Sequence, residues 1–330
     1  MKKYLTLILL LCLFFVTSCS KKEEHDIKDY QVVMEYKDGF KIQVLTDVHL
    51  CALSNLEEQE YYLTNSIIKA DADLIVVDGD SFFEATKQEV KFFFNFMDSF
   101  DKPWVYLKGN HDHQGKFAPS YVDKELNKCK NVINVDFDDN LSGEANFYVD
   151  LMNGTDLVYR LFMIDSGSYI RDGVMSYTYG QIEKDQIEHI EKIQQTETDT
   201  DYQTLAFFHI PVQEFQTAYN GYVEGLFTGK GENRENSCPC DTNERQFDKL
   251  KAAGVRAMFC GHDHVNSSSI IYKDVILAYC VKSSDQIYCD NDMIGYTLIT
   301  LSNTPFSLDN IENVFIDFNL GVEEGMKYAK

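Results

Sequence analysis

Short segments of the chain place histidine, aspartate or asparagine directly after apolar runs. The residues concerned are Asp47, His49, Asp80, Asn110, His111, His209, His262 and His264, which include five of the eight histidines. Imidazole nitrogens, carboxylates and amide oxygens are suitable ligands for Mn, Fe, Zn or Co. The set therefore predicts a metal site, provided that the fold brings the segments together.

The spacing within the segments favours that convergence. In Asp47-x-His49 and in His262-x-His264 one residue separates the pair, so both side chains point to the same side of an extended backbone. Glycine precedes the functional residues at three turns, at Gly79, Gly109 and Gly261. Without a Cβ atom, these turns can bend sharply and approach their neighbours closely. One such pair alone is ordinarily incidental, whereas all the segments in one order, each after a strand, indicate a shared site.

Apolar runs alternating with amphipathic stretches predict the elements that position these residues. Strands are expected over residues 40–46, 74–77, 104–107, 147–151, 157–164, 204–208, 255–259, 269–272, 275–279, 296–301 and 313–318. Helices are expected over residues 56–70, 86–100, 180–194 and 243–253. The first half reads β-α-β-α-β, which implies a parallel sheet with right-handed crossovers. Ligands of open α/β folds bind beyond the carboxyl ends of such strands.

The ordered segments resemble the motif blocks of the calcineurin-like metallophosphoesterase superfamily, which run Asp-x-His, Gly-Asp, Gly-Asn-His-Asp/Glu, His and Gly-His-x-His. Residues 40–47, 208–211 and 259–266 are most similar to a short, single-domain branch related to purple acid phosphatases. The resemblance covers about residues 38–300 and is specific for the superfamily, not for a substrate. It implies an α/β fold, a four-layer α/β/β/α sandwich, which we expect over residues 39–320.

The resemblance also implies a centre of two divalent metal ions. The first ion would be held by Asp47, His49 and His264, the second by Asn110, His209 and His262, and Asp80 would bridge the two. Two dications with two carboxylate ligands leave a net charge near +2, which suits a phosphate dianion, and the ions can share an attacking hydroxide. The expected substrate is therefore a phosphate ester.

Two neighbouring residues are candidates for catalysis. His111 follows the ligand Asn110 and is either the general acid for the leaving group or a residue that only positions the substrate. Purple acid phosphatases place a tyrosine three residues after the bridging aspartate, where this chain has Phe83, so we expect two dications and a colourless protein. The aspartate that orients the catalytic histidine in calcineurin-type enzymes is absent there too, and Asp112 or Glu84 could substitute for it.

The expected activity is that of a phosphomonoesterase. A phosphodiesterase on the same site is the nearest alternative, and a non-catalytic surface-binding lipoprotein that retains the fold is another. The long polar loop at residues 211–241 either shapes specificity or holds its aromatic side chains in a small satellite core.

The first residues predict export. Lys2 and Lys3 precede an apolar run at residues 5–16, and residues 16–19 read Val-Thr-Ser-Cys, which resembles a bacterial lipobox. We expect residues 1–19 to be a lipoprotein signal peptide with Cys19 as the lipidated residue, residues 20–38 to be a tether, and the protein to be a membrane-anchored lipoprotein of the bacterial cell envelope, periplasmic or surface-exposed. An ordinary cleaved signal peptide is the alternative.

Charge and cysteine content limit the remaining possibilities. The formal net charge of −23 argues against a nucleic-acid partner held by electrostatic attraction. Besides Cys12 in the leader and Cys19, seven cysteines remain, an odd number, so they cannot all be paired. Cys238 and Cys240 form a pair in a polar loop. A disulfide between one of them and another loop cysteine, such as Cys51, is compatible with the sequence.

Overall fold

The computed structural model describes residues 25–112, 114–118, 120–137, 139–172, 176–197, 201–242 and 244–316. An eight-stranded sheet has the order β1 (Gln31–Glu35), β5 (Phe147–Asn153), β6 (Asp156–Met163), β9 (Gln203–Phe207), β11 (Val255–Cys260), β13 (Val275–Tyr279), β12 (Ser269–Tyr272) and β10 (Gly229–Lys230). A five-stranded sheet has the order β15 (Ile311–Phe315), β14 (Gly295–Thr300), β2 (Lys41–Leu45), β3 (Leu74–Asp78) and β4 (Trp104–Leu107). A separate hairpin consists of β7 (Tyr169–Asp172) and β8 (Ser176–Tyr179).

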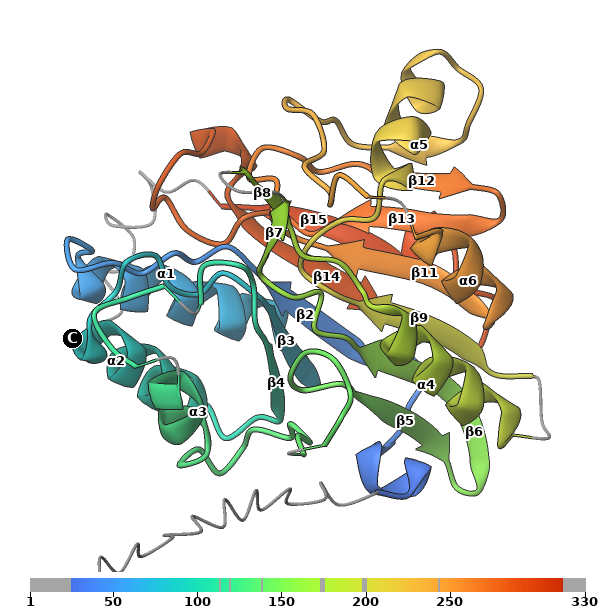
Figure 1. Ribbon diagram of the computed structural model, residues 1–330, viewed down its shortest axis with the longest axis horizontal. Coiled ribbons are helices and arrows are strands. Elements are labelled where there is room, and N and C mark those ends of the chain that lie inside the picture. The colour runs from blue at the N-terminus through green and yellow to red at the C-terminus, as the bar shows by residue number, and fades with distance from the viewer. Residues whose placement is uncertain are drawn as a thin grey trace, which may run out of the picture.

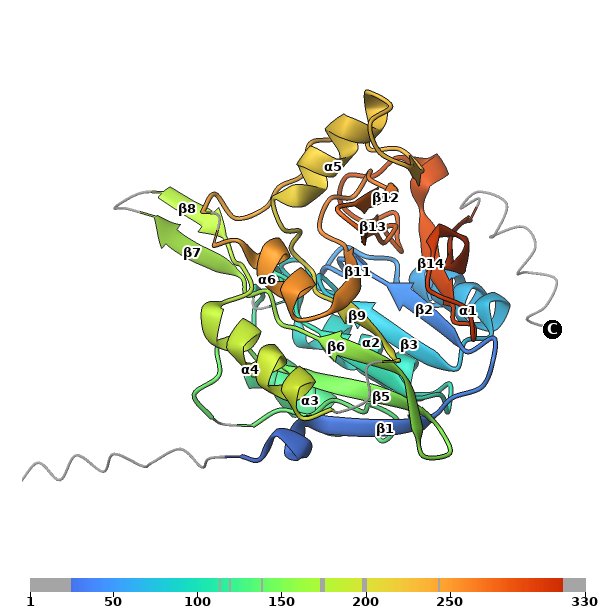
Figure 2. The ribbon, with the colours of Figure 1, turned by 90° about the vertical axis from the view of Figure 1, so that its right-hand side faces the viewer.

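Helices cover the outer sides of the two sheets (Figure 1). On the side of the five-stranded sheet lie α1 (Leu56–Ala70), α2 (Lys87–Asp98) and α3 (Ser120–Leu126). On the side of the eight-stranded sheet lie α4 (Lys184–Gln195) and α6 (Gln246–Ala252). The fold class is therefore confirmed as α/β, with the four layers that the sequence predicts. Figure 2 shows the β7–β8 hairpin projecting from this body, and α5 (Glu214–Val223) at its periphery.

Strand β3 shows how the sequence produces these layers. Leu74 and Val76 belong to the hydrophobic core that also contains residues of the eight-stranded sheet. Ile75 and Val77 point the other way, into the core beneath α1 and α2. All four side chains are almost fully buried. A strand that alternates between two apolar environments must be apolar at every position, which is why this run contains no polar residue before Asp78.

Most of the predicted strands and helices are present in the structure with similar bounds. The strands and α-helices that the sequence did not predict are β1, β7, β8, β10, α3 and α5. Residues 20–38 were assigned to a tether, but Gln31–Glu35 pair in parallel with β5, so this part of the assignment is wrong and the folded body begins before residue 39. In the 211–241 loop, Phe215 of α5 is buried in the main core and Tyr219, Tyr222 and Phe227 pack against it, which supports the packing role for these aromatics.

Two further expectations concern cysteines and membranes. Within the described residues, every cysteine is a free thiol, so the disulfide considered between loop cysteines does not form. No helix in the described ranges is long and apolar enough to cross a bilayer. The expected signal peptide and Cys19 lie outside the described residues.

Candidate metal centre

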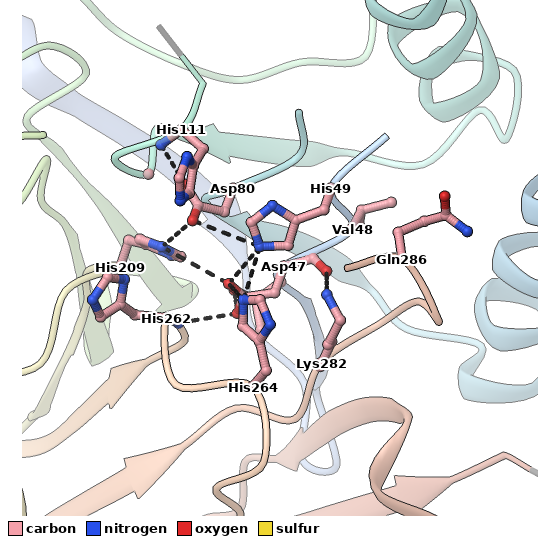
Figure 3. Close-up of polar contacts among 12 residues, drawn as sticks. Asp47, Val48, His49, Asp80, His111, His209, His262, His264, Lys282 and Gln286 are labelled. Carbon is pink, nitrogen blue, oxygen red and sulfur yellow. Dashed lines mark hydrogen bonds and ion pairs between the residues drawn. The ribbon is translucent and has the colours of Figure 1, made fainter. Parts of the chain in front are cut away.

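The predicted ligands converge on one buried site at the carboxyl ends of β2, β3, β4, β9 and β11 (Figure 3). They form two groups, one of Asp47, His49 and His264 and one of Asp80, His209 and His262. Within each group the potential ligand atoms lie within 4.8 Å of one another. The six side chains are buried, and the two groups match the two metal sites that the resemblance implied, with Asp80 placed in the second.

Asp80 lies between the two groups. Its Oδ2 is 3.2 Å from Nε2 of His209 and 3.7 Å from Nε2 of His49. Asp47 Oδ1 is 3.4 Å from Nε2 of His264, 3.5 Å from that of His49 and 3.9 Å from that of His209. The carboxylates of Asp80 and Asp47 thus each lie near histidines of both groups, which places the two groups side by side, and the resemblance identifies Asp80 as the bridging ligand.

The loops that carry the ligands have an unusual backbone. Asp47, His49, Asp80 and His262 all adopt positive φ angles, of 54°, 51°, 50° and 75°. This left-handed region is uncommon for residues other than glycine and is concentrated at functional sites. Main-chain hydrogen bonds hold two of the loops together, since the N–H of His49 donates to the carbonyl of Asp80 at 2.9 Å.

Glycine is required beside these loops, as the sequence predicted. A Cβ atom on Gly109 would lie 2.2 Å from Oδ1 of Asp80, and one on Gly79 would lie 2.5 Å from the ring of His209. Both distances are far shorter than van der Waals contact, so any side chain at these positions would displace a ligand.

Hydrogen bonds to carbonyl groups orient two of the imidazoles. Nδ1 of His209 lies 2.7 Å from the carbonyl oxygen of Asp78, and Nδ1 of His264 lies 2.9 Å from that of Tyr288. A ring nitrogen next to a carbonyl must carry the proton and donate it, so Nε2 is the atom of each ring that is left for a cation, which would displace any proton bound there. Nε2 of His209 faces Asp80 and Nε2 of His264 faces Asp47, so each ring is oriented toward the carboxylate of its own group.

The electrostatics of the site also fit cations. Burial lowers the pKa of His49 and of His262 to about 3, so both imidazoles are neutral at pH 7 and can donate a lone pair. Burial alone would raise the pKa of Asp47. The positive charge of the neighbouring His209 and the hydrogen bonds of His264 and His49 have the larger effect, so the pKa of Asp47 is lowered. Among the described residues, Asp47 Oδ1, Asn110 Oδ1 and His209 Nε2 are buried atoms without a hydrogen bond. Buried polar atoms are rarely left so, and divalent cations would satisfy all three.

Asn110 is oriented by the β7–β8 hairpin. Its amide nitrogen Nδ2 donates a hydrogen bond to the hydroxyl of Tyr169 at 2.9 Å. The amide nitrogen therefore points toward the hairpin, and the amide oxygen Oδ1 points toward the site. Asn110 is the residue that the resemblance assigned as a ligand of the second ion. Tyr169 was not predicted as a site residue, because nothing in its local sequence relates it to Asn110.

The two predicted catalytic residues have different surroundings. His111 lines the site, and its Nδ1 lies 2.8 Å from Oε1 of Gln114. Asp112 instead accepts hydrogen bonds from the backbone N–H of Gly109 at 2.7 Å and of Phe82 at 3.1 Å. The proposed role of Asp112 in orienting His111 is therefore wrong, since its carboxylate braces the loop and Gln114 contacts the imidazole.

The segment after β13 holds the Asp47–His49 loop and was also missed. Lys282 is buried, and its Nζ donates to the carbonyl of Asp47 at 2.6 Å. The next two residues contribute as well: Ser283 Oγ accepts from the N–H of Thr46, and Ser284 Oγ donates to the carbonyl of Val48. Each of these side chains contacts the backbone of a residue that is 235 to 237 positions earlier in the chain. No local sequence pattern indicates such contacts.

A pocket of about 90 Å³ opens onto the ligands. Its floor is formed by ligand side chains and His111. Its walls are formed by Phe83, Tyr179, Cys238, Asp263, Ile287 and Tyr288. The site thus combines two buried sets of metal ligands with a small chamber beside them.

The family model for calcineurin-like phosphoesterases matches residues 40–266. This is more than half of the chain, and the protein belongs to that family.

Individual relatives are more distant. Probable inactive purple acid phosphatase 14 of Arabidopsis thaliana is 26% identical over an alignment of 245 residues that covers 66% of this chain and 60% of the relative. Probable inactive purple acid phosphatase 29 of the same plant is 27% identical over an alignment of 244 residues that covers 66% of this chain and 61% of the relative. The chain thus spans about three fifths of the length of these relatives. The crystal structure of a dimetal phosphatase from Danio rerio aligns with a TM-score of 0.53 at 11% identity, over 80% of this chain and 93% of that one, which shows the shared fold.

Proposed function

We propose that the protein is a phosphomonoesterase that depends on two divalent metal ions. The observation that carries the proposal is the pair of buried Asp and His groups that share Asp80 and lie beside His111. When bound, the two cations would supply an activated water molecule and positive charge against the phosphoryl oxygens.

The residues of the chain have distinct tasks in this proposal. Asp47, His49 and His264 hold one ion, Asn110, His209 and His262 hold the other, and Asp80 lies between them. His111 faces the same pocket and donates a proton to the oxygen of the departing alcohol. Gln114 keeps the imidazole in place through its contact with Nδ1.

The names of the two plant relatives raise the alternative of an inactive protein. This chain retains all seven ligand residues in converging positions, and a protein that only binds a partner has no physical need for them. Phe83 has no oxygen to coordinate a ferric ion, which supports two dications rather than the mixed pair of purple enzymes.

The direct experiment compares p-nitrophenyl phosphate with bis-p-nitrophenyl phosphate. The protein is depleted of metal and then reconstituted separately with Mn²⁺, Zn²⁺, Fe²⁺ or Co²⁺. We expect metal-dependent hydrolysis with a higher kcat/KM for the monoester. A higher value for the diester would make the protein a phosphodiesterase on the same site, and no turnover of either ester with both sites filled would support a binding protein.

We also propose that the protein is anchored to the bacterial cell envelope through Cys19. The support is the sequence alone, in which a basic start and an apolar run precede Val-Thr-Ser-Cys at residues 16–19. The acidic net charge makes a nucleic-acid partner unfavourable and is compatible with an exported enzyme whose local site charge comes from metals.

A further inference from the structure

Aromatic side chains of the pocket wall stand directly against the ligands and His111. The ring of Tyr288 stacks on the imidazole of His264, with centroids 4.1 Å apart and planes 20° apart. The ring of Tyr179 meets His262 edge-on at 4.4 Å. Phe83 packs against His111 at 5.0 Å. The alcohol part of a phosphate ester bound at the metal centre would therefore extend away from the metal ions between aromatic rings.

Apart from the histidines, no basic side chain lines the pocket among the described residues. Two basic side chains of neighbouring segments already have partners. Lys282 donates to the carbonyl of Asp47, and Arg234 pairs with Glu232, Asp290 and Asp292. Arg171 lies on β7 opposite Tyr177, further along the hairpin than the pocket lining. The metal ions and His111 would therefore supply the positive charge at the reacting phosphate, and no Lys or Arg stands beside the alcohol part among the described lining residues.

Carboxyl groups lie in and behind the same wall, and burial raises the pKa of the Asp263 carboxyl to about 7. Asp263 lines the pocket and is held there by hydrogen bonds from the hydroxyl of Tyr279 at 2.6 Å and from the N–H of Cys238 at 3.2 Å. The carboxylate of Glu235 accepts a hydrogen bond from the hydroxyl of Tyr288 at 3.1 Å. A second anionic group on the alcohol part would meet no Lys or Arg among the described residues of the lining, and the carboxylate of Glu235 lies behind Tyr288.

A strained residue holds one apolar wall in position. Ile287 has φ of 61°, a conformation that β-branched residues avoid, and its side chain is 42% exposed at the pocket. Its neighbours fix it from both sides: Gln286 accepts a hydrogen bond from Ser54 at 2.7 Å, and the carbonyl of Tyr288 binds His264. Backbone strain of this kind persists where the surrounding structure maintains it, and it occurs at ligand sites. Ile287 thus presents an apolar side chain, 42% of it exposed, in the wall of the pocket.

We propose that the pocket selects phosphate esters whose alcohol part is apolar and carries no further negative charge, and that Tyr179, Ile287 and Tyr288 contact that part. This selection rests on the proposed function, since it concerns the alcohol of the same reaction. Aryl and extended alkyl phosphates belong to the favoured class. Sugar bisphosphates, nucleoside triphosphates and phosphorylated carboxylic acids belong to the disfavoured class.

The test compares phenyl phosphate with 3-carboxyphenyl phosphate. The two esters have nearly the same shape, and the carboxyphenol leaves about as readily as phenol, so a lower rate for the charged ester reports the pocket rather than the chemistry. We expect kcat/KM for phenyl phosphate to be higher by about 10-fold or more, which corresponds to about 1.4 kcal/mol.

Variants separate the walls from the metal centre. Tyr288→Ala and Ile287→Asn should reduce the preference for phenyl phosphate several-fold while two metal ions stay bound, and asparagine tolerates the positive φ. Tyr288→Phe, which retains the ring, should keep the preference. Tyr177→Ala is the matched control, because Tyr177 lies on the same hairpin as Tyr179 but is 65% exposed and outside the pocket lining.

The outcomes distinguish this proposal from the proposed function. If both esters are hydrolysed equally well, or if the charged ester is preferred, the selection is overturned while the phosphatase activity stands. If Tyr288→Ala and Tyr177→Ala change the preference equally, the walls do not make the selection. If neither ester is hydrolysed by metal-replete protein, the proposed function itself fails.

Discussion

The metal-ligand loops and the segments that surround them contrast sharply. The ligands lie at strand ends, are buried, and are held by main-chain hydrogen bonds and close glycine contacts. The surrounding segments, which are the β7–β8 hairpin and residues 282–288, contribute side chains from loops and from a hairpin that projects from the body (Figure 2). The difference suggests a division of labour, in which the strand ends define the chemistry and the surrounding segments orient the ligands and select the substrate.

The largest effect is expected from removing the bridging ligand. Asp80→Ala leaves two cations close together without the carboxylate between them, so metal affinity should fall by more than the roughly 10–100-fold that loss of an outer contact causes, and turnover should reach background. Elemental analysis after dialysis measures the metal. Asp80→Asn, which keeps an oxygen but not the charge, should retain more metal than the alanine variant. Full occupancy in Asp80→Ala would show that Asp80 is not a ligand.

His111→Ala should lose catalysis without losing metal. General acids contribute about 10²–10⁴-fold, or roughly 3–5 kcal/mol of transition-state stabilisation. The loss in kcat should be large for alkyl phosphates and small for p-nitrophenyl phosphate, whose leaving group needs little protonation.

Gln114→Ala should give the same dependence on the leaving group with a smaller loss, since it removes only the contact with Nδ1 of His111. An equal loss on both esters in His111→Ala would make His111 a substrate-positioning residue, and loss of metal would make it a ligand.

Tyr169→Phe tests whether the hairpin acts on the metal centre. The change removes the hydroxyl that accepts from Asn110, so the amide can rotate and the affinity for one of the two ions should fall about 10-fold or more, as for other outer-sphere contacts. Metal titration with Tyr177→Phe as control measures this. Unchanged affinity for both ions would restrict the hairpin to substrate contacts.

The smallest effect on catalysis is expected from Cys19→Ala. The anchor precedes the folded body, so the variant should move from the membrane fraction to the soluble fraction, or keep its leader, with kcat/KM unchanged. Mass spectrometry of the mature wild-type protein provides the check. An unmodified N-terminal residue beyond position 19 would contradict the proposed anchor.

The sequence predicted the metal ligands because burial restricts what can stand at a strand end. A histidine after four buried apolar residues, such as His209 after residues 205–208, needs a partner, and the repeated pattern reveals that the partners are shared. Tyr169 and Lys282 could not be predicted in the same way. Their contacts join positions 59 and 235 residues apart, and only the tertiary fold brings them together.

Asp112 illustrates a different failure. Its place next to His111 in the motif suggested an orienting carboxylate, but side chains adjacent in sequence point in different directions in a turn. The carboxylate turns back to the N–H groups of Gly109 and Phe82, and the imidazole is contacted by Gln114, three residues along the same turn.

The most direct test of the account is the metal content of the purified protein, measured together with its hydrolysis of p-nitrophenyl phosphate. The two ligand groups predict two divalent ions per chain, and stepwise removal by a chelator should abolish turnover, which returning the ions should restore. Two bound ions without hydrolysis of any phosphate ester, or hydrolysis that persists in metal-free protein, would contradict the account.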